Sequence, residues 1–180
     1  MLLLQQSVLV AAFAAGLTNA IPTTKRAPES LVVLEQFETE FGTATWYGDA
    51  EDSPISKRAP ENEATSLNRR CGSNAVTCSG SHQGPASACA QLIVSIAGPR
   101  SGQSVPSSPR SFCLTGSGGN CCVSWANPLS NAYYSQLVPA AQKVNNQCQS
   151  GGWVSGLSRD TLIGNTCTTQ CLSDRPNGCS

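Results

Sequence analysis

The chain has 180 residues, of which 12% are charged, and its formal net charge is zero. This composition excludes a strongly basic nucleic-acid-binding protein, and no stretch beyond the amino terminus is long and apolar enough for a transmembrane helix or anchor. Ten cysteines, all between Cys71 and Cys179, instead indicate a disulfide-rich domain in an oxidising compartment.

The first 20 residues, 1–20, predict a signal peptide. Two short apolar runs, 2–4 and 8–15, are followed by small residues, with Thr18 and Ala20 at the −3 and −1 positions of a cleavage site. The apolar part is too short to span a bilayer comfortably. We therefore expect the mature protein to be secreted and extracellular.

Residues 21–70 are predicted to form a pro-segment with dibasic processing sites. The pairs are Lys25-Arg26, Lys57-Arg58 and Arg69-Arg70, and the first two are each followed by Ala-Pro-Glu. The acidic pockets of a kexin-type processing protease would pair with two adjacent cations, so such a protease is an expected partner. The third pair ends directly before Cys71, which predicts the mature amino terminus there.

The pro-segment also differs from the rest of the chain in charge. Residues 21–70 hold nine acidic and six basic residues (6 − 9 = −3), whereas residues 71–180 hold two acidic and five basic residues (5 − 2 = +3). Leu34, Phe37 and Phe41 lie at i, i+3 and i+7, which predicts a short apolar helical stripe. We therefore expect the pro-segment to pack on its own domain, with a disordered spacer as the alternative.

Residues 71–180 predict a small disulfide-rich α+β domain. Pro85 can open a helix whose apolar face ends near Ile96, and a second helix is expected to start near Leu137. Alternating or β-rich runs predict a strand in the pro-segment at 43–47 and four in the domain, at 111–114, 121–125, 153–157 and 165–172. The expected fold is a split βαβ sandwich, with two helices packed on an antiparallel sheet.

All ten cysteines are expected to form disulfides. They are Cys71, Cys78, Cys89, Cys113, Cys121, Cys122, Cys148, Cys167, Cys171 and Cys179. Cys89 and Cys148 lie on the predicted buried helix faces and should tie the helices to strands. Cys121 and Cys122 point to opposite sides of one strand, so they should take different partners, one in the helix layer and one in a loop. The complete pairing stays open.

Neither a cofactor nor a metal is expected. Cys167 and Cys171 have a permissible ligand spacing, but the sequence has no CxxC pair, and His82 is its only histidine. The domain contains no Glu and two Asp, Asp160 and Asp174, so a glycosidase pair would need both. A Ser–His–Asp set would need His82, and no nucleophile-elbow sequence is present. We therefore predict that the domain is not an enzyme.

Aromatic and basic residues of the domain are candidates for partner binding. They are Tyr133, Tyr134, Lys143 and Trp153, together with Arg100 and Arg110. Such residues could form a mixed face for a protein, glycan or membrane target. The alternative for a tryptophan is core filling, which we favour for Trp125 because it shares a strand face with Val123.

An ordered set of motifs runs through the domain. It comprises Cys71-Gly72, Cys89 on a helix, Cys121-Cys122-Val123-Ser124-Trp125, Cys148 with Gly151-Gly152, and a closing stretch from Cys171 to Cys179. This set, over roughly residues 71–180, resembles small secreted fungal cysteine-rich proteins of the killer-toxin-like and necrosis-inducing effector type. The toxin members imply interference with ion channels or damage to cells.

The sequence therefore predicts a secreted, non-catalytic, disulfide-stabilised domain that is released from a pro-form and binds a surface or membrane target. Two alternatives stay open. Residues 27–56 lie between two dibasic pairs and could be released as a diffusible peptide. The chain could also be a wall-associated structural protein.

Overall fold

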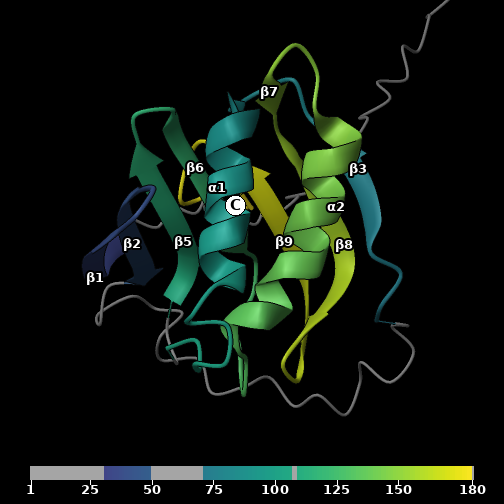
Figure 1. Cartoon of the computed structure of the whole chain (residues 1–180). Coiled ribbons are helices and arrows are strands. Elements are labelled where there is room, and N and C mark those ends of the chain that lie inside the picture. The colour runs from purple at the N-terminus through teal and green to yellow at the C-terminus, as the bar shows by residue number, and fades with distance from the viewer. Residues whose placement is uncertain (1–30, 50–70, 107–108, 180) are drawn as a thin grey trace, which may run out of the picture.

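The computed structural model describes residues 31–49, 71–106 and 109–179 (Figure 1). The predicted signal peptide and all three dibasic pairs lie outside these residues. The main element is a seven-stranded antiparallel sheet with the order β1-β2-β5-β6-β9-β8-β3. Its strands are β1 (Leu31–Thr39), β2 (Gly42–Asp49), β3 (Ala75–Cys78), β5 (Pro109–Gly116), β6 (Gly119–Trp125), β8 (Gly156–Ile163) and β9 (Thr166–Ser173). A second, two-stranded sheet pairs β4 (Gly84–Pro85) with β7 (Trp153–Val154).

The predicted fold class, a small split βαβ sandwich, is wrong. The protein is mostly β, and two of the seven strands of its sheet, β1 and β2, come from residues 31–49, ahead of the cysteine-rich region. The sheet therefore crosses the predicted boundary at residue 70. We call residues 31–49 the hairpin. Its turn lies between Thr39 and Gly42, which pair with each other.

The predicted helical stripe at Leu34, Phe37 and Phe41 is also wrong, because Leu31–Thr39 is a strand. The β-branched Val32 and Val33 fit an extended chain better than a helix. Pairing with β2 supplies the backbone hydrogen bonds, and a β-bulge between Val33 and Glu35 breaks the period-2 alternation that would have marked a strand. The expected strand at 43–47 lies inside β2.

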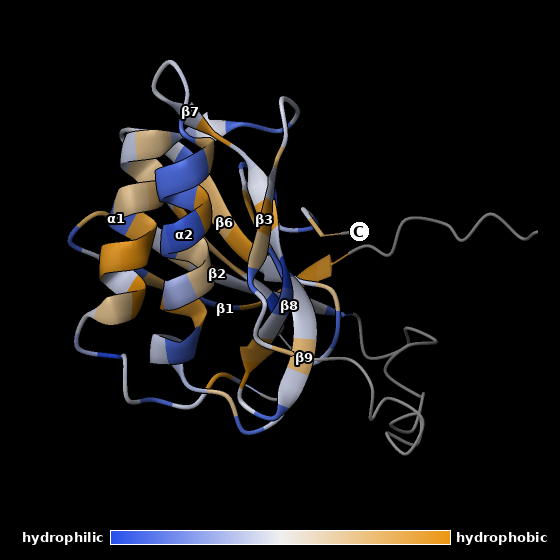
Figure 2. Ribbon diagram, turned by 90° about the vertical axis from the view of Figure 1, so that its right-hand side faces the viewer, coloured by the Kyte–Doolittle hydropathy of each residue, from blue (hydrophilic) through white to orange (hydrophobic). Residues whose placement is uncertain are grey.

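Two helices cover one face of the large sheet (Figures 1 and 2). They are α1 (Ala86–Ala97) and α2 (Val138–Cys148), and a 3₁₀ helix, η2 (Tyr134–Leu137), leads into α2. Pro85 directly precedes α1, and a proline lies in the first turn of α2, where its missing N–H breaks no helical hydrogen bond. None of the helices formed by the described residues is long and apolar enough to cross a membrane.

The core lies between these helices and the sheet. An aromatic cluster fills one end of it, and consists of Trp46 from β2, Phe112 from β5, Trp125 from β6 and Tyr134 from η2. The Trp46 ring centroid lies 4.6 Å from that of Phe112 and 5.1 Å from that of Tyr134. Burial of Trp125 agrees with the core role expected for it. The centre of the cluster, however, is a residue of the hairpin.

Five disulfides link all ten cysteines, as predicted. They are Cys71–Cys167, Cys78–Cys148, Cys89–Cys121, Cys113–Cys122 and Cys171–Cys179. Two of them tie α1 to β6 and α2 to β3, which confirms the expected helix-to-strand links. The expectation of a loop partner for Cys122 is wrong, because it bonds to the residue directly opposite it on the neighbouring strand β5.

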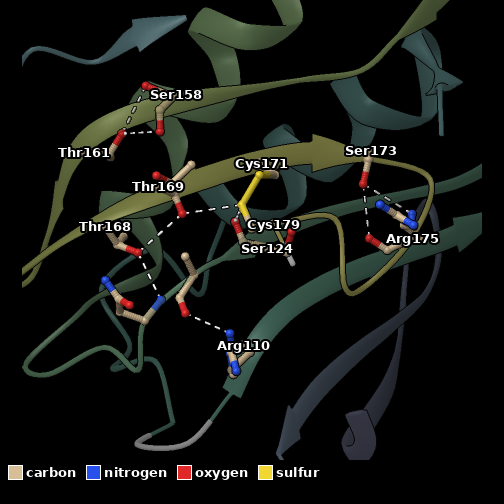
Figure 3. Close-up of a disulfide and its surroundings, with 12 residues drawn as sticks. Arg110, Ser124, Ser158, Thr161, Thr168, Thr169, Cys171, Ser173, Arg175 and Cys179 are labelled. Atoms are coloured by element: carbon tan, nitrogen blue, oxygen red, sulfur yellow. Dashed lines mark hydrogen bonds between the residues drawn. A yellow bond between two sulfur atoms is a disulfide. The ribbon is translucent and has the colours of Figure 1, made fainter. Parts of the chain in front are cut away.

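The residues after β9, 174–179, form a C-terminal tail on the sheet face opposite the helices (Figure 2). The Cys171–Cys179 disulfide fastens the tail to β9 (Figure 3). The Cys179 sulfur lies 3.5 Å from the carbonyl oxygens of Ser124 and Thr169. The tail therefore closes over β6 and β9 on the side where no helix packs.

Candidate functional site

A small open cavity lies beside this tail. Parts of β3, β8 and β9, the loop that carries His82, and the tail enclose a volume of about 140 Å³. Its lining is rich in short polar side chains and includes Thr77, Ser79, Ser81, Ser173 and Arg175. Pockets for drug-sized ligands are typically about 300–1,000 Å³, so this cavity could hold only a small polar group.

His82 and Asp174 meet at the mouth of the cavity. The His82 backbone is left-handed, with φ +52°, and its carbonyl oxygen accepts a 3.0 Å hydrogen bond from the Asp174 N–H. The Asn120 side chain donates to the Asp174 carbonyl oxygen, which anchors the start of the tail. The His82 Nδ1 and Asp174 Oδ1 atoms are 3.9 Å apart, longer than a hydrogen bond, and the His82 and Asp174 side chains are 47% and 42% exposed.

This pair does not form a nucleophilic site with any described serine. Within the described ranges, no serine hydroxyl makes a hydrogen bond to the His82 imidazole. The Ser173 hydroxyl donates instead to the Arg175 carbonyl oxygen, and the Ser79 and Ser81 hydroxyls bond to each other. A serine nucleophile needs an adjacent base to take its proton, so the cavity has no activated nucleophile in this arrangement.

A second candidate surface is the edge of the large sheet at β1. Val32, Val33 and Leu34 are exposed there, and the Val33 side chain reaches 56% exposure. β1 is hydrogen-bonded to β2 on one side, and no strand among the described residues pairs with its other side. A long edge strand with exposed apolar residues is a template for pairing with another chain, and charges and bulges limit such pairing. β1 bears both, in Glu35 and Glu38 and in the bulge between Val33 and Glu35. We call Leu31–Thr39, with its exposed apolar residues, the β1 edge.

The aromatic residues predicted to bind a partner are not brought together. Tyr134 is buried in the aromatic cluster, and its hydroxyl oxygen accepts a 2.7 Å hydrogen bond from the Trp46 indole N–H. Tyr133 and Trp153 are exposed. They flank α2, which is roughly 16 Å long at 1.5 Å per residue, and therefore lie near its opposite ends. Their binding roles stay predictions.

The predicted basic residues hold structural contacts. The Lys143 ammonium donates to the Asn74 carbonyl oxygen at 2.6 Å, which joins α2 to the segment before β3. Arg100 and Arg110 both contact the hairpin: the Arg100 guanidinium lies 3.9 Å from a Glu35 carboxylate oxygen, and Arg110 lies 3.3 Å from one of Asp49. The hairpin carboxylates therefore engage two of the domain's five basic residues.

Burial also changes the acidity of Tyr134. Desolvation raises the pKa of Tyr134 above its ordinary value of 10.0, and the hydrogen bond from Trp46 opposes this only in part. The charged groups beside it are Arg100 and Glu35, whose effects on the pKa have opposite signs. Tyr134 is therefore neutral at physiological pH, and acts as a packing and hydrogen-bonding residue.

Trp46 is completely buried, and the sequence predicts no role for it. The strand expected at 43–47 places Ala44 and Trp46 on one face. Its partner strand, β5, lies more than 60 residues further along the chain, where local patterns do not reveal the pairing. Over the described ranges, no group of three or more His, Cys, Asp or Glu side chains could hold a metal ion.

Comparison with protein-family models places the chain in a fungal group. Residues 23–179 match the model described as Fungal WD-like, and the chain belongs to that family. The matched region includes the hairpin as well as the cysteine-rich region. The described residues form one wide sheet and one very short sheet, rather than the radial blades of a propeller. No curated protein and no solved structure is detectably similar to the chain.

Proposed function

We propose that this Fungal WD-like protein is a secreted, non-catalytic binding protein of the killer-toxin-like or effector-like type. A kexin-type protease releases it from a pro-form, and it acts by binding a protein on the surface or membrane of another cell. Five disulfides in a small domain are typical of extracellular proteins, which supports the secreted location.

The β1 edge is the observation that carries this proposal. The side on which no described strand pairs offers a row of backbone N–H and C=O groups to an extended segment of a partner, which would add to the sheet as a further strand. Val32, Val33 and Leu34 supply apolar contact area. Glu38, also exposed on this strand, favours a segment that carries basic as well as apolar side chains, whereas Glu35 already lies beside Arg100.

The non-catalytic role is supported by the state of the His82 cavity. The His82 Nδ1 atom lies 3.9 Å from the Asp174 Oδ1 atom, too far for a hydrogen bond, and the nearby serine hydroxyls bond to other partners. Asp160, the other acidic residue of the domain, lies at the bulge in the middle of β8 and accepts a hydrogen bond from Ser73. The two carboxylates of the domain thus lie on different parts of the fold, Asp160 within β8 and Asp174 directly after β9.

To test this, the secreted chain is immobilised and used to capture proteins from the surface of target cells. The same experiment is done with a variant of the β1 edge and with a matched control variant. Val33→Glu places a charge at the β1 edge, whereas Leu162→Glu places one on β8 at a residue with the same exposure, 56%. We expect wild type and Leu162→Glu to capture the same protein, and Val33→Glu to lose it.

Three results would contradict the proposal. Equal capture by Val33→Glu would show that the β1 edge is not the contact. Binding that survives protease digestion of the target surface would identify a glycan or lipid ligand instead of a protein. Turnover of ester, peptide or glycoside substrates that Asp174→Asn abolishes would show that the protein is an enzyme.

A further inference from the structure

The hairpin lies between two dibasic pairs in the sequence. Lys25-Arg26 precedes it, and Lys57-Arg58 and Arg69-Arg70 follow it before the first cysteine. None of the five disulfides involves a residue before Cys71. Cleavage at the pairs on both sides would therefore leave the hairpin with no covalent link to the cysteine-rich region.

The hairpin is nevertheless built into the large sheet. β2 pairs with β5 from Thr43 opposite Thr115 to Gly48 opposite Pro109. Gly42 and Gly116 pack backbone to backbone at the turn, so closely that a Cβ on either would overlap the neighbouring chain. If the hairpin left, β5 would become an edge strand with a row of unpaired backbone groups.

Side chains fasten the open end of the hairpin as well as its middle. Trp46, in the middle, is completely buried and bonds to the Tyr134 hydroxyl. On β1, the Arg100 guanidinium stacks 3.7 Å above the centre of the Phe37 ring and lies beside Glu35. At the end of β2, the largely buried Asp49 side chain pairs with Arg110. Departure would expose Phe112 and Tyr134 and leave these two arginines without their carboxylate partners on the hairpin.

We infer that dibasic processing does not discard the hairpin, and that it stays bound as a short second chain of the mature protein. It binds to the surface formed by β5, Tyr134 and Arg100, and the occupant of that surface is residues 31–49 of the same chain. The inference rests on the processing step of the proposed function. It deepens that function, because the β1 edge stays with the mature protein only if the hairpin does.

The experiment is native cleavage of the secreted full chain with a dibasic-specific protease, followed by size-exclusion chromatography over a serial dilution. We expect one peak that contains two polypeptides. Denaturing electrophoresis without reductant should then separate a fragment beginning at Ala27 from the disulfide-linked remainder, because no disulfide joins them. Trp46→Ala should lose the fragment from the peak, and Val33→Ala, on the exposed side of the same hairpin, should retain it.

Two outcomes overturn the inference. The first is elution of the fragment alone from wild type while the remainder stays folded, which would favour a diffusible peptide. The second is resistance of the dibasic pairs to cleavage until the chain is unfolded, so that no two-chain form arises. If Trp46→Ala is not secreted, the wild-type dilution series decides. Failure of the proposed function gives a different result. The two chains would stay together after cleavage, and Val33→Glu would still capture the target protein.

Discussion

Replacing Trp46 by alanine tests whether the hairpin belongs to the hydrophobic core. The side chain is completely buried and contacts the rings of Phe112, Trp125 and Tyr134. Truncating a buried aromatic residue to alanine typically costs about 3–5 kcal/mol. The lost hydrogen bond to the Tyr134 hydroxyl adds roughly 1 kcal/mol. We therefore expect Trp46→Ala to lower the free energy of unfolding of the secreted full chain by about 4–6 kcal/mol.

Urea unfolding followed by far-ultraviolet circular dichroism measures this change, because it does not depend on the fluorescence of the deleted tryptophan. Trp46→Phe keeps most of the buried ring but removes the N–H donor, so it should cost less than the alanine variant. Val33→Ala is the matched control on the hairpin. Its side chain is exposed, and substitutions at such positions usually change stability by no more than about 0.5 kcal/mol.

Two results would refute the reasoning. A loss of less than about 1 kcal/mol for Trp46→Ala would mean that the core tolerates the absence of its central aromatic ring. Similar losses for Trp46→Ala and Val33→Ala would mean that the hairpin contributes through strand pairing rather than through burial. The m-values of the variants must agree with that of wild type, because a change in m indicates a different unfolded or native state.

Four further predictions concern the mature amino terminus, the disulfides, the pH dependence of stability and the pro-segment. Amino-terminal sequencing of the disulfide-linked mature chain should give Cys71, and a dominant Ala59 would contradict this assignment. Removing the Cys71–Cys167 disulfide by double serine substitution should cost about 3.5 kcal/mol, because with Cys78–Cys148 intact it closes a loop of about 26 residues, made of 71–78 and 148–167. Removing Cys113–Cys122, which closes a loop of 9 residues, should cost about 2.6 kcal/mol, and a larger shift in urea midpoint for Cys113–Cys122 than for Cys71–Cys167 would argue against loop entropy. Because burial raises the pKa of Tyr134, its contribution to stability is fully present below pH 10.0 and is lost as pH rises through the folded-state pKa. The melting temperature of wild type should therefore fall more steeply above pH 10.0 than that of Tyr134→Phe, and equal slopes would contradict this. Oxidative refolding of residues 71–180 should yield more native disulfides when residues 21–70 are added in trans, and the Phe37→Ser substitution in the added segment should reduce that gain. Equal yields with and without residues 21–70 would make them a passive spacer.

The helices could be predicted because their signals are local. Pro85 fixes the start of α1, and Cys89, Leu92 and Ile96 lie on one face of it at helical spacing. The same holds for α2, where a proline in the first turn sets the start. Local patterns also indicated a strand at 121–125. Such signals depend on a few neighbouring residues, and the tertiary structure agrees with them here.

The sheet as a whole could not be predicted, because its order is set by contacts that are distant in sequence. The β2–β5 pairing joins residues on either side of the predicted processing region. In β1 the bulge between Val33 and Glu35 hides the alternation, and the remaining apolar spacing imitates a helix. Tyr133 and Tyr134 are adjacent and identical in type, yet one is exposed and one is buried, because only Tyr134 faces Trp46.

The disulfides and the hairpin stabilise different parts of the molecule by different means. Every other strand of the large sheet, and both helices, lie within the region that the five disulfides cross-link. The hairpin is held by strand pairing, by Trp46 and by the carboxylates that meet Arg100 and Arg110. Before cleavage the chain between them keeps the hairpin at a high effective concentration, and after cleavage only these contacts remain. A binding edge placed on the hairpin would therefore be covalently secured before cleavage at the dibasic pairs, and after cleavage it would depend on strand pairing, on the burial of Trp46 and on the contacts with Arg100 and Arg110.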